Sequence, residues 1–374
     1  MIKWFNSKTM SVLPVIDNTQ GELVSMLTAL LVNGVNSKPV ATVSYADGVC
    51  TLEVGADHGF VAHSVVGIQN STQSALAGGE FSLSKITDTT ISFDVASTVI
   101  NETGLNVRYA PLGYTAHFES QGRAAYKSKN PLHTGYLRVD DVKFAGTAAN
   151  AAKFASVEIC EDMTDFDTVV GAQAPYEASY PLQNRETISG RSNGWFKWYY
   201  SAQSHPISEG ASYPSPSGKK DYMLIGDDTG FYLVLYPNGD LPVLYGIFRT
   251  ENNLHLMATN GYTVKPYQER NVLSNSFFYC ICSLYGLQGV DTLDKEYIYP
   301  LYAFDSKDKP STSNQVFCRP INMYSVYFDV IHRPMPNVYL SESKRIDSGS
   351  IVNSIENKYL AFTYDKATLL FEVC

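Results

Sequence analysis

The sequence is poor in charged residues and has no segment of the kind that anchors or exports a protein. Only 17% of its 374 residues are charged, whereas 44% are hydrophobic. The longest apolar run near the start, TALLV at 28–32, is far shorter than the roughly 20 residues that span a membrane. The first residues, MIKWFNSKTMSVLPVIDNTQ, also lack the continuous apolar core of a signal peptide. We therefore expect no membrane partner and a protein that is made in a cytoplasm, where it stays soluble or joins an assembly.

Clusters of basic residues are absent as well. The net charge is −9 and is spread without long runs of one sign. The nearest approach to a basic patch, Lys219 and Lys220, is a single pair in a loop rich in Ser, Pro and Gly. A nucleic-acid binder needs clustered Lys and Arg to displace the counterions of the phosphates. The sequence therefore predicts no nucleic-acid partner.

Cysteine and histidine do not occur at the spacings of metal sites. There is no Cys-x-x-Cys pair and no His at zinc-finger spacing. Cys280 and Cys282 fall on one face of a predicted strand and could be neighbours, but buried free thiols are favoured because Cys packs as a small hydrophobic residue. We predict neither a disulfide framework nor a metal ligand. The cysteines are Cys50, Cys160, Cys280, Cys282, Cys318 and Cys374.

The motifs of common active sites are missing too. The chain contains no G-x-S-x-G nucleophile turn, no G-x-G-x-x-G and no Walker sequence to cradle a phosphate. An active site can still assemble from distant positions. On these grounds the sequence predicts no catalytic residue, no cofactor-binding residue, no cofactor and no enzyme.

Aromatic residues, in contrast, are abundant. The 26 Tyr and 18 Phe raise the aromatic fraction to 13%. Such rings favour strands and contact surfaces, because a stiff ring buries a large area at a small entropic cost. The composition indicates a β-rich chain that places much of its surface against partners.

One helix is predicted near the start, in NTQGELVSMLTALLVNG. Thr19 and Glu22 fit a capping box, and Gly34 after Asn33 fits a left-handed helix end. A single apolar stripe at helical spacing would pack on a sheet or on a neighbouring subunit. The stripe consists of Leu23, Met26, Leu27, Leu30 and Leu31.

Short alternating strands follow between residues 40 and 109, separated by Gly, Asn and Asp turns. They predict a small β-barrel or sandwich. Its HGFVAHSVVGIQN and GEFSLSKITDTTISFDV resemble a small β module that recurs in phage structural proteins, in which an HGF turn leads into a strand. His58 is then the turn histidine, with a structural role.

The strand pattern continues to the C-terminus, with a hairpin predicted at Asp227–Gly230, where Gly would take a positive φ. No internal repeat of fixed period is visible. We predict a mainly β fold: an antiparallel β-sandwich-like main domain, one N-terminal helix and an inserted small β-barrel or sandwich module. The expected divisions are 1–39 for the N-terminal segment and helix packing on the main domain, 40–109 for the module and 110–374 for the main domain.

The stretch YLRVDD at 136–141 places two carboxylates next to each other. Successive side chains of a strand point to opposite faces, so Asp140 and Asp141 cannot converge on one substrate atom without a bulge. A glycosidase needs two carboxylates about 5–10 Å apart across one cleft. We expect Arg138 and one of the aspartates to tie neighbouring strands or loops together.

The later carboxylates in EICEDMTDFDT give only a weak indication of a calcium site. The spacing of Asp165 and Asp167 is that of a partial calcium loop, but the required Gly and the terminal bidentate Glu are missing. Caps and turn hydrogen bonds explain aspartates at strand ends more simply.

The aromatic stretch GWFKWYYSAQ has two interpretations. Trp195 and Tyr199 alternate with Trp198 and Tyr200 on the two faces of a predicted strand. These four residues could form an aromatic surface that stacks on sugars or binds a partner protein. A strand buried by the core on one face and by a partner on the other is favoured.

Several of these segments together carry a family resemblance. MIKWFNS…MSVLPVIDNTQGELVSMLTALLVNG, AAYKSK…YLRVDD…EDMTDFDT, GWFKWYYS and PMPNVYLSES occur in this order. The chain resembles a family of tailed-bacteriophage virion structural proteins of the tail, neck or decoration type. The resemblance implies no enzyme activity and no cofactor, and it makes Arg138, Asp140 and Asp141 a structural signature.

The leading hypothesis is therefore a virion structural protein, attached at the neck (collar) or tail, that forms homo-oligomers and binds other virion proteins. The virion would be assembled in the host cytoplasm. A capsid decoration protein is the closest alternative. A receptor- or glycan-binding fibre or spike, with a host surface glycan as ligand, and a depolymerase are the others.

Overall fold

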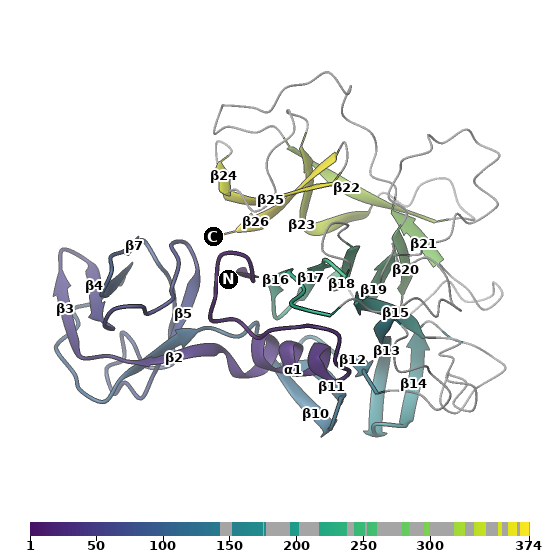
Figure 1. The fold of residues 1–374 in the computed structure, drawn as a ribbon, viewed down its shortest axis with the longest axis horizontal. Coiled ribbons are helices and arrows are strands. Elements are labelled where there is room, and N and C mark those ends of the chain that lie inside the picture. Colours follow the sequence, from purple (N-terminus) through teal and green to yellow (C-terminus); the bar gives the residue numbers. More distant parts are fainter. Residues whose placement is uncertain are drawn as a thin grey trace.

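The computed structural model describes residues 1–142, 152–174, 176, 195–201, 217–237, 243–250, 253–259, 279–283, 295–298, 318–325, 333–341, 351–353, 358–364 and 367–373. The chain is mainly β and forms several antiparallel sheets around one helical segment (Figure 1). The predicted fold class is confirmed. The division into 1–39, 40–109 and 110–374 stays a prediction.

The N-terminal segment contains a strand that the sequence did not predict, followed by the predicted helix. Strand β1 (Lys3–Asn6) precedes helix α1 (Glu22–Thr28), which continues as a π-helical turn η1 (Ala29–Asn33). The helical segment ends at Gly34, where the sequence predicts its end, and φ is positive at 70°, but the ψ of 167° is not that of the predicted left-handed helix end. Within the described residues no helix is long and apolar enough to cross a membrane. All five residues of the apolar stripe are buried: Leu23, Met26, Leu27, Leu30 and Leu31.

The predicted capping box at Thr19 and Glu22 is only half formed. The Glu22 carboxylate does reach back to the Thr19 amide, at 3.4 Å, and more closely to the Asp17 amide, at 2.7 Å. Gly21 occupies the position before the helix, however, and no side chain of that residue can accept a bond. Because the helix begins two residues later than the pattern implies, the Thr19 hydroxyl does not cap it.

The region predicted as a module forms two small sheets together with β2, which lies just before residue 40, at the left of Figure 1. Their strand orders are β2-β9-β5-β6 and β3-β4-β8-β7. The rings of Phe81 and Phe93 stack in their interior with centroids 4.4 Å apart. The strands are β2 (Val35–Pro39), β3 (Thr42–Ala46), β4 (Val49–Glu53), β5 (Val65–Gln69), β6 (Glu80–Ser82), β7 (Lys85–Ile86), β8 (Thr90–Asp94) and β9 (Asn106–Tyr109).

His58 has the structural role that the sequence predicts. Its Nδ1 accepts the amide of Phe60 at 3.0 Å, so its Nε2 carries the proton and donates to the carbonyl of Thr87 at 2.9 Å. His58 thus fixes its own turn through Nδ1 and ties it through Nε2 to the connection between β7 and β8.

Strand β1 links the small sheet β2-β9-β5-β6 to the largest sheet. The indole N–H of Trp4 donates to the carbonyl of His63 at 2.9 Å. The buried ammonium of Lys3 pairs with Glu80 on β6 at 2.8 Å. On its other side, β1 pairs with β16 in the largest sheet.

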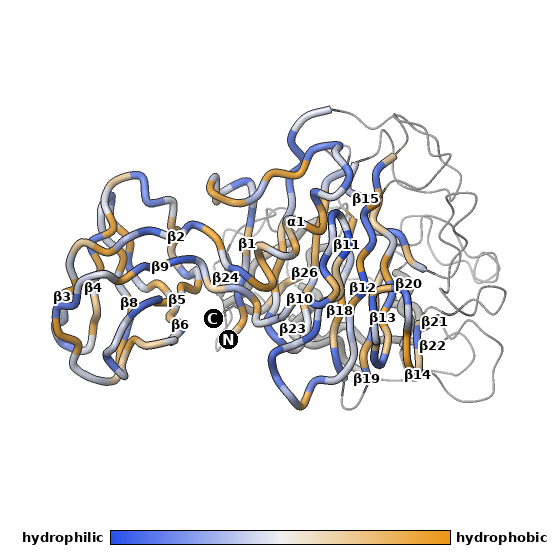
Figure 2. Tube along the Cα trace, turned by 90° about the horizontal axis from the view of Figure 1, so that it is seen from below, coloured by the Kyte–Doolittle hydropathy of each residue, from blue (hydrophilic) through white to orange (hydrophobic). Residues whose placement is uncertain are grey.

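A second sheet contains strands from the segments AAYKSK, YLRVDD, EDMTDFDT and GWFKWYYS. Its order is β10-β11-β12-β13-β14, and β15 also pairs with β13. Hydrophobic and hydrophilic residues alternate along these strands, which lie beside α1 (Figure 2). The strands are β10 (Tyr114–Ser120), β11 (Arg123–Ser128), β12 (Tyr136–Asp140), β13 (Lys153–Asp165), β14 (Thr168–Ala174) and β15 (Phe196–Ser201).

The largest sheet has 12 strands in the order β1-β16-β17-β18-β19-β20-β21-β22-β23-β26-β25-β24. Every neighbouring pair is antiparallel, as expected for a sandwich-like fold. Its later strands are β16 (Tyr222–Asp227), β17 (Gly230–Leu235), β18 (Val243–Thr250), β19 (Asn253–Thr259), β20 (Tyr279–Ser283), β21 (Lys295–Ile298), β22 (Cys318–Ser325), β23 (Arg333–Ser341), β24 (Ile351–Asn353), β25 (Lys358–Tyr364) and β26 (Ala367–Val373).

The hairpin between β16 and β17 forms where it was predicted, but its glycine acts differently. Asp227 Oδ1 accepts bonds from the Thr229 amide at 2.9 Å and hydroxyl at 2.6 Å. Gly230 does not have a positive φ. A Cβ at this position would lie only 2.5 Å from the carbonyl oxygen of Ile247 on the next strand. Gly230 is therefore required for close strand approach, not for a left-handed turn.

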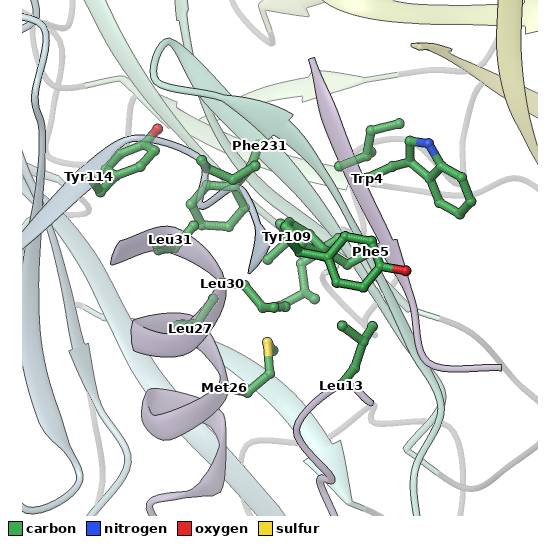
Figure 3. Close-up of a cluster of buried hydrophobic side chains, with 14 of the residues drawn as sticks. Trp4, Phe5, Leu13, Met26, Leu27, Leu30, Leu31, Tyr109, Tyr114 and Phe231 are labelled. Atoms are coloured by element: carbon green, nitrogen blue, oxygen red, sulfur yellow. The ribbon is translucent and has the colours of Figure 1, made fainter. Parts of the chain in front are cut away.

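The main core lies where β1, the helical segment and the first strands of the largest sheet meet (Figure 3). Tyr114 of β10 meets Phe231 of β17 edge to face at 6.0 Å, and Phe5 meets Tyr109 in the same way at 6.3 Å. Aromatic contacts thus join the largest sheet to the sheet that contains β10 and to the small sheet that contains β9. The labelled side chains are Trp4, Phe5, Leu13, Met26, Leu27, Leu30, Leu31, Tyr109, Tyr114 and Phe231.

Candidate functional site

The predicted signature residues lie at β12 and the turn that follows it, and all three are buried. Arg138, Asp140 and Asp141 are 1%, 2% and 1% exposed. Strand β12 is covered along both edges, by β11 and by β13. Charged groups at this depth are costly unless they are paired and hydrogen-bonded, so their partners define what the site does.

Arg138 ties β12 to β13 and to the turn beyond it. Its Nη1 donates to Oε1 of Glu158, the residue directly opposite on β13, which is 0% exposed. Its Nη2 donates to the carbonyl of Phe166 in the turn between β13 and β14. The guanidinium also lies over the ring of Trp195, 4.6 Å from its centroid. One side chain thus joins β12, β13, the following turn and the start of β15.

Asp140 forms a second ion pair on the same side of the sheet, and this pair links β12 to β11. Arg123 of β11 donates from Nε to Asp140 Oδ2 at 3.0 Å. The same guanidinium bonds Asp167 and lies 4.0 Å from the centroid of the Phe166 ring. Asp167 is one of the two residues of the partial calcium pattern, and here it pairs with an arginine.

Asp141 turns away from this cluster and meets the N-terminal helix. Its Oδ2 accepts the Leu23 amide at 3.1 Å, in the first turn of α1. Its Oδ1 lies 2.8 Å from the hydroxyl of Tyr200 on β15. The first turn of a helix has amides with no partner inside the helix. Asp141 therefore provides the cap that Thr19 does not, from 118 residues along the chain.

The surroundings of Asp141 disfavour a negative charge. Burial raises the pKa of the Asp141 carboxyl to about 8, and the neighbouring Asp140 adds to the effect. The hydrogen bonds from Tyr200 and from the backbone at Leu23 and Gly21 act in the opposite direction but do not offset burial. Burial likewise raises the pKa of the Tyr200 phenol, and the nearby Asp141 raises it further.

Three of the four aromatic residues of β15 and its start are buried and do not form an exposed surface. As the alternation predicts, Trp198 and Tyr200 face the core, whereas Trp195 lies on the side of Arg138. Trp198 is 0% exposed and stacks on Tyr245 of β18 at 5.5 Å. Trp195 and Tyr200 are buried as well. Burial within the chain itself removes these three rings from the expected aromatic surface, because other parts of the same chain already cover them.

Tyr199 differs from its neighbours because it is only partly buried. It packs against Phe154 on β13, with centroids 5.2 Å apart. A partner interface at Tyr199 stays a prediction.

The arrangement serves to hold elements together. Asp140 and Asp141 diverge, as strand alternation predicts, and each accepts bonds from groups that belong to other elements. Across the described ranges, no group of three or more His, Cys, Asp or Glu residues could hold a metal ion. Cys50 and Cys160 are buried free thiols, as expected, while the side chains of the other four cysteines lie outside the described part.

Sequence reasoning missed three partners in this network: Arg123, Glu158 and the helix amide of Leu23. The alternation places Arg138 and Asp140 on one face, so two oppositely charged partners on adjacent strands could have been expected. The register that brings Arg123 opposite Asp140 depends on the length of the turn after β11. The contact with Leu23 carries no local sequence signal, because it depends on how the helix docks.

Comparison with known proteins adds little. No family model matches the chain, and no curated protein matches it. Among solved structures, the phage phi92 endosialidase is similar over 89% of this chain and 69% of that chain, with 10% identity and a TM-score of 0.16. A likeness at this score does not establish a shared fold, and nothing about this chain is concluded from it.

Proposed function

We propose that the chain is a structural protein of a tailed-bacteriophage virion, attached at the neck or tail, that acts through protein–protein contacts. The observation that carries the proposal is the ordered set of segments that resembles such a family, from MIKWFNS near the start to PMPNVYLSES near the end. The aromatic, weakly charged composition supports it, because such surfaces suit permanent contacts.

The contacts between these segments support the proposal further. The N-terminal helix of the first segment is capped by Asp141 of YLRVDD. Arg138 of YLRVDD bonds Phe166 of EDMTDFDT and lies over Trp195 of GWFKWYYS. Three of the four resembling segments are therefore in contact in the fold, and Arg138 and Asp141 make these contacts.

The proposal includes a role without catalysis, because the two adjacent carboxylates act as structural partners. Asp140 binds Arg123, and Asp141 caps a helix. Homo-oligomers and contacts with other virion proteins are part of the same proposal.

Mass spectrometry of separated particle parts tests the proposal. Heads, tails and neck-containing assemblies of the phage that carries this chain would be purified, with the major capsid and tail-tube proteins as markers of purity. We expect the chain in the tail or neck fraction at a fixed ratio to its marker. Detection only in tail-less heads would contradict tail or neck attachment and favour a decoration protein. Absence from every particle fraction would overturn the virion assignment as a whole.

A further inference from the structure

The hydroxyl of Tyr200 has one hydrogen and two neighbours that can accept it. The phenol oxygen lies 2.8 Å from Asp141 Oδ1 and 3.2 Å from the carbonyl oxygen of Thr19. A carbonyl oxygen only accepts hydrogen bonds, and so does an ionised carboxylate. If Asp141 were ionised, it would compete with Thr19 for a single proton.

A protonated Asp141 removes this competition. Its own hydroxyl would donate from Oδ1 to the Tyr200 oxygen, which leaves the phenol hydrogen free for Thr19. The second oxygen, Oδ2, would still accept the Leu23 amide at 3.1 Å, as the carbonyl oxygen of a neutral acid does. The phenol hydrogen, the Thr19 carbonyl, the Leu23 amide and both Asp141 oxygens then each have a partner.

Several titratable groups face this position from the elements packed on it. Asp140 is the preceding residue on β12, and its partner Arg123 on β11 is also bound to Asp167. Tyr126 of β11 and Tyr200 of β15 lie near the Asp141 carboxyl. From the N-terminal segment, Glu22 and Asp17 act on Tyr200. The surroundings thus bring further carboxylates to a site that is 1% exposed.

We propose that Asp141 is held as a neutral carboxylic acid in the folded protein and acts as a pH-sensitive latch between the N-terminal segment and β12. When a base in solution takes the proton, the Tyr200 hydroxyl turns to the carboxylate, and the Thr19 carbonyl keeps only the more distant Glu22 amide, at 3.4 Å. A negative charge then lies buried at the start of α1. The link between the loop at Thr19, the helix and β15 is loosened.

The direction of the pH effect follows from the raised pKa. In the unfolded chain the carboxyl would titrate near its ordinary value of 3.8, whereas burial raises the pKa to about 8 in the folded chain. The folded state therefore binds the proton more tightly. The stability that Asp141 contributes is fully present below about pH 4, falls as the pH rises toward about 8, and is constant above that.

The variant Asp141→Asn tests the latch, because the amide copies the hydrogen pattern of a neutral acid. Its Nδ2–H can donate to Tyr200, and its Oδ1 can accept the Leu23 amide. Denaturant unfolding of the full chain would be followed from pH 5 to 9. We expect the unfolding constant of the wild type, divided by that of the variant, to rise by about tenfold per pH unit until about pH 8 and then to level off. A ratio that does not change with pH, or a variant less stable than the wild type at pH 8, would overturn the proposal.

Asp140→Asn is the matched control, because it removes a carboxylate from the neighbouring position whose partner is a guanidinium. We expect this variant to keep a rise relative to Asp141→Asn, but to level off at a somewhat lower pH than the wild type, because Asp140 adds to the raised pKa of Asp141. If the ratio for Asp140→Asn did not rise with pH, the rise seen in the wild type could not be caused by titration of Asp141.

Hydrogen exchange of the wild type provides a test that needs no variant. Peptides covering residues 17–27 would be followed by mass spectrometry between pH 6 and 9, with rates corrected for the intrinsic effect of pH. We expect protection at this segment to decrease through about pH 8 while protection of β17 stays constant. Unchanged protection at 17–27 across this range would contradict the latch.

Discussion

Single residues near β12 differ sharply in what they contribute, although many are equally buried. Arg138 and Glu158 form an ion pair in which both side chains are at most 1% exposed. A buried pair of this kind gains little over well-packed apolar residues, yet removing one partner leaves a charge that burial penalises. The pair therefore fixes the register of β12 against β13 more than it adds to stability.

This reasoning predicts an asymmetric result for Arg138 and Glu158. Arg138→Met should lower the free energy of unfolding by about 3–5 kcal/mol, because it takes away the guanidinium that neutralises the buried Glu158 carboxylate. The double variant Arg138→Met, Glu158→Met should recover most of that loss. Urea unfolding of the singles and the double gives the coupling. A double variant as unstable as the two single losses added together would contradict the account.

A second residue prediction concerns Trp198, which the sequence left open as a sugar-stacking or interface ring. The side chain is fully buried, and its indole N–H donates to the Met257 carbonyl at 3.2 Å. Trp198→Ala should therefore cost about 3–5 kcal/mol of stability. Leu132→Ala, at a side chain that is 86% exposed, is the control and should stay within about 0.5 kcal/mol of the wild type. A Trp198→Ala protein as stable as the wild type would contradict the burial of this ring in the core.

Elements of the fold were predictable where the signal is local. The apolar stripe of the helix and the alternation of GWFKWYYSAQ gave the correct buried faces, because helical and strand periods fix which side chains share a face. The capping box was only half right, since Asp141 reaches the helix start from a distant strand. Strand β1 was missed because four residues carry too short a pattern.

The hairpin at Gly230 was also only partly predictable from a local pattern. The sequence indicates a turn, but only the packing of β17 against β18 shows that space is the constraint. Gly230→Ala should destabilise the chain by about 1–3 kcal/mol, because the new methyl group would press on the backbone at Ile247. Gly67→Ala is the control: its Cβ would be 3.8 Å from the nearest atom, and stability should stay within about 1 kcal/mol of the wild type. Equal thermal midpoints for the two variants would contradict this interpretation.

At the scale of the whole molecule, the N-terminal segment joins parts that are distant in sequence. Strand β1 pairs with the largest sheet, while Lys3 and Trp4 contact the small sheets. No pattern in MIKWFNS could have indicated this, because each contact depends on the arrangement of complete sheets. The family resemblance could not predict these contacts either, because it identifies segments of the sequence and not which segments pack together.

The contact of Trp4 gives a prediction at this scale. Trp4→Phe keeps an aromatic ring but removes the indole donor to the His63 carbonyl, a bond worth about 0.5–1.5 kcal/mol. Opening of the small sheets should become about two- to tenfold more frequent, so limited proteolysis within residues 40–109 should accelerate by that factor. Val15→Ala, at a side chain that is 56% exposed, is the control and should leave the rate unchanged. Equal cleavage rates for Trp4→Phe and the wild type would show that β1 does not secure these sheets.

A density map of the intact phage particle at side-chain resolution tests the central claim most directly. We expect the fold described here to occur in several copies at the neck or tail, with protein neighbours against its less charged, aromatic surfaces. Density for the chain only on the capsid surface would contradict the proposed attachment. A particle without the chain would contradict the assignment as a virion structural protein.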